Sequence, residues 1–320
     1  MSGRPTIQQV AAAAKVSAST VSRVFNQPHL LRMETVTRVQ RLAEEMGYVP
    51  NRFARAMVTG HTNVLGLVVP DITNPFFPPL VRAAQREAET YGMSVTLAET
   101  DSVPDRELAQ LAVLGVHCEG VIIASSRLTA EELRQFAKQT KVVLINNDTD
   151  GLARVLVSSA RGLEEGIRQL SAEGARRFLY VGGPHRSWSE GERSSTVQRV
   201  AEELGLTASY VRNDSGTYAE ARNMAASMSF DADAIVAFDD IIACGVLDGL
   251  SDRGILVPED VRLLGCDDAL PVQTRPRLST VRLDGPAGVR EAVALLAACK
   301  EPAVPEARVV IPGMLTMRET

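Results

Sequence analysis

The chain has 320 residues and a 45% hydrophobic composition, which is enough for buried cores in more than one domain. Its longest apolar runs, such as residues 64–70, fall far short of the roughly 20 residues that a transmembrane helix needs. The N-terminus has no apolar segment behind its first arginine and does not resemble a secretory signal. The cysteines are widely spaced, which disfavours disulfides and zinc. We therefore expect a cytoplasmic globular protein without a metal or another cofactor.

The net charge of −5 is unevenly distributed along the chain. Residues 1–60 hold eight basic and three acidic side chains, a net charge of +5, whereas the remaining residues carry −10. A basic head on an acidic body favours an anionic partner for the head alone. From charge alone, an ordinary solvated face on a small helical domain is an equal alternative.

Apolar residues in the first 46 positions recur at helical spacing and predict three short helices. They are Ile7, Val10, Ala11 and Ala14, then Val21, Val24 and Phe25, then Val36, Val39, Leu42, Ala43 and Met46. Thr6 and Gln9 form the pattern of a capping box, and Ser17 is a good N-cap for the second helix. Because only residues 15–17 separate the first two helices, we expect the sharp crossing of a helix-turn-helix.

The second predicted helix begins with small side chains, which lets its backbone approach a large partner closely. Ala18, Ser19 and Thr20 would meet a DNA major groove first. Arg23 lies one turn further along and offers a fork that suits guanine O6 and N7. For Arg23 alone, a structural role is an equal alternative, but the whole arrangement favours DNA.

Several stretches resemble the lactose/galactose repressor (LacI/GalR) family. They are TIQQVAAAAKVSASTVSRVFN, GYVPNRFARAMVTGHTNVLGLVVPDITNPFF, FLYVGGP, VPEDVRLLGCDD, RPRLSTVRLD and MLTMRET, and they span essentially the whole chain. The resemblance implies a helix-turn-helix headpiece on a two-lobed, periplasmic-binding-protein-like body that dimerises and binds operator DNA in a ligand-dependent way. It implies headpiece contacts with DNA from Thr6, Ser17, Ala18, Ser19, Thr20, Ser22, Arg23 and Asn26. Lys15 replaces a small turn residue and Arg32 replaces a capping serine, and each change should lower stability slightly.

Residues 50–61 are predicted to form a hinge between head and body. Pro50 can stop one segment and Asn51 can cap a helix that is too short to be stable in water without packing. The resemblance implies that this helix pairs with its dimer mate in the minor groove, with contacts from Asn51, Arg52, Ala54, Arg55 and Met57. Met57 stands where the family has a leucine wedge, and its apolar chain should still insert between base pairs. A linker role without DNA contact is the alternative for Met57.

From about residue 62 the chain alternates short strand patterns with helix patterns, which predicts two lobes, each a parallel sheet with helices on both faces. We expect a first series with helices near 75–91, 104–115 and 129–139, and a second series that begins at 155–158 and includes helices near 191–204 and 240–252. Ligands of such sheets bind beyond the carboxyl ends of the strands. The candidates there are residues 71–77, Asn146, residues 184–193, Asp239 and Asp267.

Matching the chain to the family residue by residue implies an effector pocket suited to a sugar-like polyol. Its members are Asn74, Phe76, Phe77, Asn146, Ser187, Ser189, Arg193, Tyr218, Asp239 and Asp267. Tyr218 takes the place of a stacking aromatic residue. Leu283 and the pair Ser158-Ser159 depart from the family pattern, so the identity of the ligand is not implied.

An enzyme and an exported solute-binding protein are the alternatives on the same two-lobed fold. Asp239-Asp240 and Asp267-Asp268 offer carboxylates, but sequence neighbours seldom converge and Asp239 is as easily a helix cap. The chain contains no GxSxG, HExxH or GK[ST] motif. We therefore predict no catalytic site. A solute-binding protein would have no use for a basic helix-turn-helix.

The combined prediction is an α+β multidomain chain with a helix-turn-helix headpiece (1–49), a hinge (50–61) and a two-lobed effector-binding and dimerisation domain (62–320). Its predicted function is a homodimeric, sequence-specific transcriptional repressor. We expect its partners to be double-stranded operator DNA, a sugar-like effector and a second copy of the chain, with no membrane partner.

Overall fold

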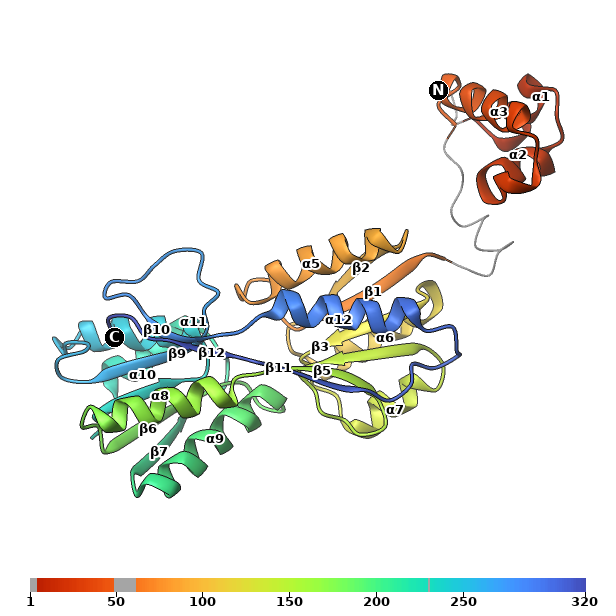
Figure 1. The fold of residues 1–320 in the computed structure, drawn as a ribbon. Helices are drawn as coiled ribbons and strands as arrows, with labels where there is room; N and C mark the ends of the chain where they lie inside the picture. The colour runs from red at the N-terminus through yellow and green to blue at the C-terminus, as the bar shows by residue number, and fades with distance from the viewer. Residues whose placement is uncertain (1–4, 49–61, 230) are drawn as a thin grey trace. The chain divides into compact units, whose positions relative to one another are not determined.

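The computed structural model describes residues 5–48, 62–229 and 231–320. The chain divides into two compact units, Met1–Thr62 and Asn63–Thr320. The smaller unit holds α1 (Ile7–Ala14), α2 (Ala18–Asn26), the 3-10 turn η1 (Pro28–Leu30) and α3 (Met33–Glu45) (Figure 1). The three predicted helices are therefore confirmed, with residues 15–17 between the first two.

The ends of these helices follow from their local sequence. Thr6 and Gln9 form the capping box of α1, and the Ser17 side chain accepts a hydrogen bond from the Thr20 amide at the start of α2. Lys15 ends α1 in the left-handed conformation, with φ of 55°, which a glycine adopts at lower cost. The apolar faces of the helices meet in one core, where Val10, Val21 and Val39 are fully buried.

The larger unit consists of two lobes. The sheet of the first lobe has the strand order β11-β5-β4-β3-β1-β2, and all of its pairs are parallel. Its strands are β1 (Val64–Val69), β2 (Ser94–Glu99), β3 (Gly120–Ala124), β4 (Lys141–Ile145), β5 (Ala153–Ser158) and β11 (Arg308–Pro312). Its helices are α5 (Phe77–Thr90), α6 (Pro104–His117), α7 (Ala130–Ala137) and α12 (Gly285–Ala298).

The second lobe repeats this architecture. Its sheet has the order β12-β10-β9-β8-β6-β7, and β12 is antiparallel to β10 while the other pairs are parallel. Its strands are β6 (Arg177–Gly182), β7 (Thr207–Arg212), β8 (Ala234–Ala237), β9 (Arg262–Asp267), β10 (Ser279–Arg282) and β12 (Met314–Thr316). Its helices are α8 (Ala160–Ala172), α9 (Trp188–Leu204), α10 (Tyr218–Ser227) and α11 (Asp240–Ser251).

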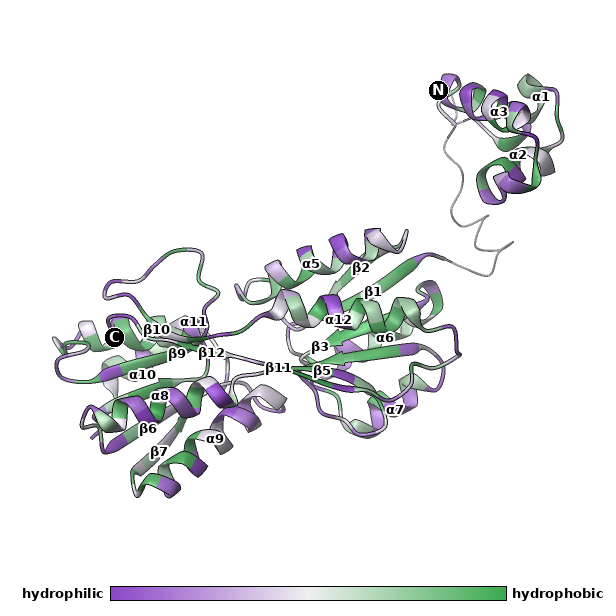
Figure 2. Ribbon diagram, viewed as in Figure 1, coloured by the Kyte–Doolittle hydropathy of each residue, from purple (hydrophilic) through white to green (hydrophobic). Residues whose placement is uncertain are grey.

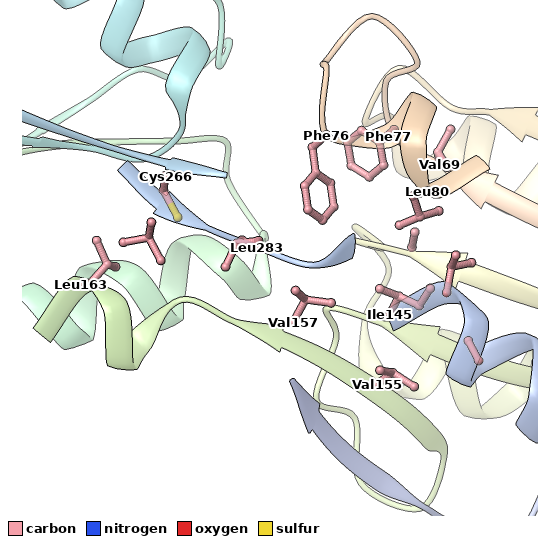
Figure 3. Packing of buried hydrophobic residues seen from close by; sticks show 14 of the residues in the cluster. Val69, Phe76, Phe77, Leu80, Ile145, Val155, Val157, Leu163, Cys266 and Leu283 are labelled. Atoms are coloured by element: carbon pink, nitrogen blue, oxygen red, sulfur yellow. The ribbon is translucent and has the colours of Figure 1, made fainter. Parts of the chain in front are cut away.

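The chain passes between the lobes from β5 to α8, from β10 to α12, and from β11 to β12. Near these crossings Val157 and Leu283 belong to an apolar cluster that draws residues from both lobes (Figure 3). Gly313 lies at the last crossing, where an added Cβ would stand 2.5 Å from Leu283 Cδ2. The segments that cross between the lobes therefore pack against one another through apolar side chains.

Two details of the predicted body are corrected. The segment 155–158 was expected to open the second lobe, but β5 is a strand of the first sheet, because the chain leaves that lobe only after β5. Strand β12 departs from the predicted parallel arrangement, because it returns beside β10 in the opposite direction. The prediction also omitted α8, β7, α10 and α12.

Hydropathy follows the arrangement of sheets and helices. Apolar residues lie along central strands such as β1, and polar residues lie on the outer faces of helices (Figure 2). Among the described residues, no helix combines the length and the apolar character needed to cross a membrane.

Candidate functional site

The first turn of α2 presents hydroxyl groups to solvent. Ser17 Oγ lies 2.7 Å from Ser19 Oγ and 2.9 Å from Thr20 Oγ1, and it accepts the Thr20 amide over 3.1 Å. Ser17 and Ser19 are exposed, while Ala18 packs partly against the headpiece core. The turn is therefore both capped and free of large side chains, as the sequence predicted.

Arg23 projects from the exposed side of α2. Within residues 5–48, no carboxylate lies within 4 Å of its guanidinium, so its charge is available to an external anion or base. Asn26 and Ser22 lie one turn apart on the same helix, and Asn26 Nδ2 donates to Ser22 Oγ over 3.2 Å. Thr6 is exposed at the start of α1. The predicted hinge residues Asn51, Arg52, Ala54, Arg55 and Met57 lie outside the described residues.

A second candidate site lies in the cleft between the two lobes of the larger unit. With the exception of Tyr218, every residue of the predicted effector pocket lines this cavity of about 90 Å³, namely Asn74, Phe76, Phe77, Asn146, Ser187, Ser189, Arg193, Asp239 and Asp267. Asn146 directly follows β4, and Asp267 ends β9. The placement agrees with the rule that ligands of parallel sheets bind at the carboxyl ends of strands.

Arg193 and Asp267 form a buried ion pair on the side of the cleft that belongs to the second lobe. Arg193 Nη2 donates to Asp267 Oδ1 over 2.9 Å, and Arg193 Nη1 donates to the Phe238 carbonyl. The guanidinium also stacks on the Phe238 ring, 4.5 Å from its centroid. Burial raises the pKa of Asp267 to about 7, although the Arg193 charge acts in the opposite direction.

Asp239 is held from both sides of the cleft. Its Oδ1 accepts the Ile242 amide over 2.8 Å and caps α11, and its Oδ2 accepts a hydrogen bond from Asn74 Nδ2 over 3.1 Å. Burial raises the pKa of Asp239. Asn74 belongs to the first lobe and Asp239 to the second, so a direct hydrogen bond closes the cleft at this point.

The remaining members are fixed by local contacts. Asn146 has a φ of 52°, and its Oδ1 accepts the Val157 amide over 2.8 Å, which ties the end of β4 to β5. Phe76 and Phe77 pack edge to face, with ring centroids 5.2 Å apart. Ser187 caps α9 by accepting the Glu190 amide. These contacts fix the positions of the lining side chains.

Tyr218 does not line the cleft, in contrast to its predicted stacking role. It is the first residue of α10, and its hydroxyl donates to Asp248 of α11. The side chain therefore joins two helices of the second lobe. Ser158 and Ser159, which depart from the family pattern, instead contact Glu192 on α9, where the Ser159 amide lies 2.9 Å from Glu192 Oε2.

The structure adds lining residues that the sequence prediction missed, namely Pro70, Ser102, Ser125, Arg127, Ser215, Gly216 and Phe238. Ser125 and Arg127 follow β3 directly, so the same strand-end rule would have found them. Arg127 brings a second buried guanidinium into the cleft, with 7% of its surface exposed. Phe238 follows β8 in the same way.

A larger groove, of about 720 Å³, lies between α9 and β7. All of its lining residues belong to the second lobe, and its buried carboxylate, Glu190, already accepts hydrogen bonds from Tyr180, Tyr210 and the Gly183 amide. The smaller cleft is the better candidate, because it gathers polar groups from both lobes. No group of three His, Cys, Asp or Glu side chains in the described part of the chain is arranged to hold a metal.

Two family models match the sequence. The model for "Periplasmic binding protein-like domain" matches residues 167–320, and the model for "Bacterial regulatory proteins, lacI family" matches residues 6–51. The HTH-type transcriptional regulator GalS of Salmonella typhimurium is 31% identical over 288 residues, which cover 87% of this chain and 84% of that relative. The chain belongs to the lacI family of bacterial regulatory proteins. It is a DNA-binding regulator of transcription.

Solved structures of lacI-family regulators share the fold. The lac repressor dimer, bound to operator and the anti-inducer ONPF, matches with a TM-score of 0.88 and 22% identity over 99% of each chain. The complex of the transcriptional regulator CelR with cellobiose matches with a TM-score of 0.72 and 25% identity, again over 99% of each chain. The predicted headpiece and two-lobed body are thus confirmed as a lac repressor-like fold.

Proposed function

We propose that this lacI-family regulator is a cytoplasmic homodimer that represses transcription from its operator and senses a sugar-like polyol. The observation that carries the effector assignment is the cleft, where an amide of the first lobe faces carboxylates and a guanidinium of the second. Residues 1–49 would recognise the operator and residues 50–61 would form the hinge. Residues 62–320 would bind the effector and the second subunit.

The chemistry of the cleft suits a ligand with several hydroxyl groups. Asp239 and Asp267 accept hydrogen bonds from hydroxyls, and Arg193 donates them, so together they serve both roles of a sugar hydroxyl. Phe76 and Phe77 offer an apolar surface to the carbon face of such a ligand. The complex of the related CelR with cellobiose supports a sugar-like ligand.

Effector binding would act through the relative closure of the lobes. The hydrogen bond between Asn74 and Asp239 joins the two lobes across the cleft, so a polyol that takes up the Asp239 carboxylate must displace this bond and let the lobes part. The chain segments that cross between the lobes would act as the hinge. A ligand that binds the open and closed conformations of the lobes with different affinities shifts their populations. This shift would change the placement of the headpieces.

Operator recognition is assigned to α2. Arg23 is exposed and faces no carboxylate within residues 5–48, and the first turn of α2 carries small hydroxyl side chains. A guanidinium in the major groove discriminates guanine by two parallel hydrogen bonds. We assign direct base readout to Arg23, and backbone or hydroxyl contacts to Ser17, Ser19 and Thr20.

The role of the body is binding and not catalysis. Asp240 accepts hydrogen bonds from the Thr280 hydroxyl over 2.6 Å and from the Ala269 amide over 3.2 Å. Asp268 pairs with Arg318 over 2.6 Å. In the pairs Asp239-Asp240 and Asp267-Asp268, the second aspartate is therefore engaged in structural contacts. This supports the assignment of a non-catalytic cleft.

The proposed dimer contact includes α6. This helix exposes Leu108 by 39%, Val113 by 55% and Val116 by 76%. Apolar side chains that are gathered on one helix and open to solvent mark a protein contact more often than a free surface. A second copy of the chain is the occupant that we propose, because the lac repressor of the same fold is a dimer.

A thermal-shift screen of the purified full-length protein tests the effector assignment. Hexoses, disaccharides and alditols are added singly at millimolar concentration, with nucleobases as negative controls. A ligand of the folded state raises the unfolding temperature by mass action. Hits are then tested for a changed affinity on an operator obtained by selection from random DNA. The assignment fails if nucleobases stabilise the protein and no polyol does.

A further inference from the structure

The two arginines of the cleft share an unusual property. Within the described residues, the buried side-chain nitrogen and oxygen atoms without a hydrogen-bond partner are Arg127 Nε and Arg193 Nε. Both residues line the same cavity, and they come from opposite lobes. A buried donor without an acceptor is costly, so such atoms point to a missing partner at this place.

Arg193 is in direct contact with a carboxylate, whereas the guanidinium of Arg127, among the described residues, is not. Arg193 pairs with Asp267 over 2.9 Å. In the part of the chain that the structure describes, no carboxylate oxygen lies within 4 Å of the Arg127 guanidinium, although the side chain is almost fully buried. Burial lowers the pKa of Arg127, with the more distant Glu107 acting in the opposite direction.

The loop that carries Arg127 is held firmly by Glu107 on α6. Glu107 Oε2 accepts the Arg127 amide over 3.0 Å, and Glu107 Oε1 accepts the Ser126 hydroxyl. The guanidinium itself is oriented by a hydrogen bond from Nη1 to the Ser125 carbonyl over 2.8 Å. Glu107 thus positions the backbone of Arg127 and leaves the Nε edge of the guanidinium for another acceptor.

We propose that Arg127 binds an anionic group of the effector, so that the ligand is an anionic polyol, a sugar acid or a sugar phosphate. The inference rests on the proposed function of the cleft and specifies its ligand. An ionised carboxylate or phosphate fits the planar edge of a guanidinium with two parallel hydrogen bonds and compensates its buried charge. A neutral hydroxyl satisfies one donor and leaves the charge unpaired.

The distribution of charge also orients the ligand. Asp239 and Asp267 belong to the second lobe, where they would repel an anion and accept hydrogen bonds from ligand hydroxyls. Arg127 stands on the first lobe, together with the uncharged Ser125 and Asn146. The anionic end therefore faces the first lobe, and the hydroxyl end faces the second. One ligand contacts both lobes and favours their closure.

The test compares matched neutral and anionic probes by calorimetry on the full-length protein. The panel holds D-glucitol, D-gluconate and D-glucitol 6-phosphate, with the corresponding mannose and xylose sets. The variants are Arg127→Gln, which removes the charge, Arg127→Lys, which keeps it, and Arg134→Gln, an exposed arginine of α7 outside the cleft lining. Circular dichroism and the unfolding temperature of each variant establish that it folds.

We expect an anionic member to bind the wild-type protein more tightly than its neutral counterpart. In Arg127→Gln, the affinity for that member should fall about ten- to hundredfold, while the neutral counterpart changes little. Arg127→Lys should recover part of the loss, and Arg134→Gln should bind as the wild type does. Preference for aldonates over phosphates, or the reverse, identifies which anion the site takes.

Two results would overturn the inference while leaving the polyol cleft intact: a neutral polyol that binds as tightly as its acid, or an acid whose affinity is unchanged in Arg127→Gln. Inorganic phosphate and acetate separate the inference from the wider proposal. If all polyols fail but these anions stabilise the wild-type protein and not Arg127→Gln, the anion site stands and the polyol assignment falls. If anions and polyols both fail to bind, the inference is refuted as well.

Discussion

Asn74 Nδ2 lies 3.1 Å from Asp239 Oδ2 and joins the two lobes of the body by a direct hydrogen bond across the cleft. Both partners are fixed by further contacts. Asn74 Oδ1 accepts the Phe76 amide over 3.0 Å, and Asp239 caps α11 through the Ile242 amide. Two anchored side chains therefore hold the cleft closed, and an entering ligand must compete with this bond.

Replacing Asn74 should open the ligand-free body. A hydrogen bond to a charged group contributes about 1.5–3 kcal/mol, so Asn74→Ala should shift the closure equilibrium by about ten- to hundredfold toward open forms. Small-angle scattering should report a larger radius of gyration. Thr73→Ala is the matched control, because the side-chain hydrogen bond of Thr73 in the described part of the chain goes to Asp71 of the same lobe and does not cross the cleft. An unchanged scattering curve for Asn74→Ala would show that the bond does not control closure.

Two adjacent aspartates provide a sharp test of the cleft. Asp267 lines the cleft beside Arg193, whereas Asp268 pairs with Arg318 away from it. Asp267→Asn removes the charge that accepts ligand hydroxyls and compensates Arg193, so effector affinity should fall by about 1.5–3 kcal/mol. Asp268→Asn should leave it unchanged. Calorimetry with the polyol found by thermal shift measures both, and equal affinities in the two variants would move the site elsewhere.

On DNA, Arg23 should act as a reader of sequence. Arg23→Ala should cost about 1–3 kcal/mol on the cognate operator and much less on random DNA, because only the cognate site offers the guanine edge. Arg41→Ala is the control, since Arg41 is exposed on α3 and pairs with Glu45. Gel-shift titrations at one fixed salt concentration measure the two affinities. Equal losses on both DNAs would make Arg23 a phosphate contact.

The sequence predicted the headpiece closely because its signals are local. The Thr6–Gln9 capping box, the Ser17 cap and the apolar spacing of residues 7–46 lie within a few positions of the contacts they make. The cleft was predicted through strand ends and family resemblance, which named Arg193, Asp239 and Asp267, and these three residues line one cavity. Both kinds of signal depend on short segments.

The missed features depend on contacts between distant segments. Strand β5 belongs to the first lobe through its pairing with β4 and β11, and no local pattern distinguishes it from a strand that opens a second lobe. Tyr218 turns to Asp248, 30 residues away in sequence, which its own neighbourhood does not indicate. The unpartnered Nε of Arg127 depends on how both lobes enclose the cavity, which no local pattern in the sequence indicates.

Lys15 offers a prediction about stability. Its φ of 55° lies in the left-handed region, where a non-glycine residue costs roughly 1–2 kcal/mol and glycine does not. Because glycine also loses more chain entropy on folding, Lys15→Gly should stabilise the headpiece by a net of about 0.5–1 kcal/mol. Native-state hydrogen exchange of α1 and α2 amides in the full-length protein measures the change. Lys15→Ala, which keeps the strained Cβ, should give no comparable gain, and equal protection in both variants would refute the explanation.

The last prediction concerns the dimer contact on α6. Val113 and Val116 are exposed by 55% and 76%, and we expect the second subunit to cover them. The double variant Val113→Asp and Val116→Asp would place unpaired charges in that contact. Burying an unpaired charge costs several kcal/mol, so the dimer dissociation constant should rise by about a hundredfold or more. Sedimentation velocity at a series of concentrations measures the change.

A control at a distant site separates this effect from a general loss of solubility. Leu204 is an exposed apolar residue at the end of α9 in the second lobe, 37% accessible. Leu204→Asp should leave the dimer intact. Because two linked headpieces bind the two halves of an operator with a high effective concentration, the α6 variant should also lose operator affinity while each headpiece keeps its fold. A dimer of wild-type stability in the α6 variant would exclude this helix from the subunit contact.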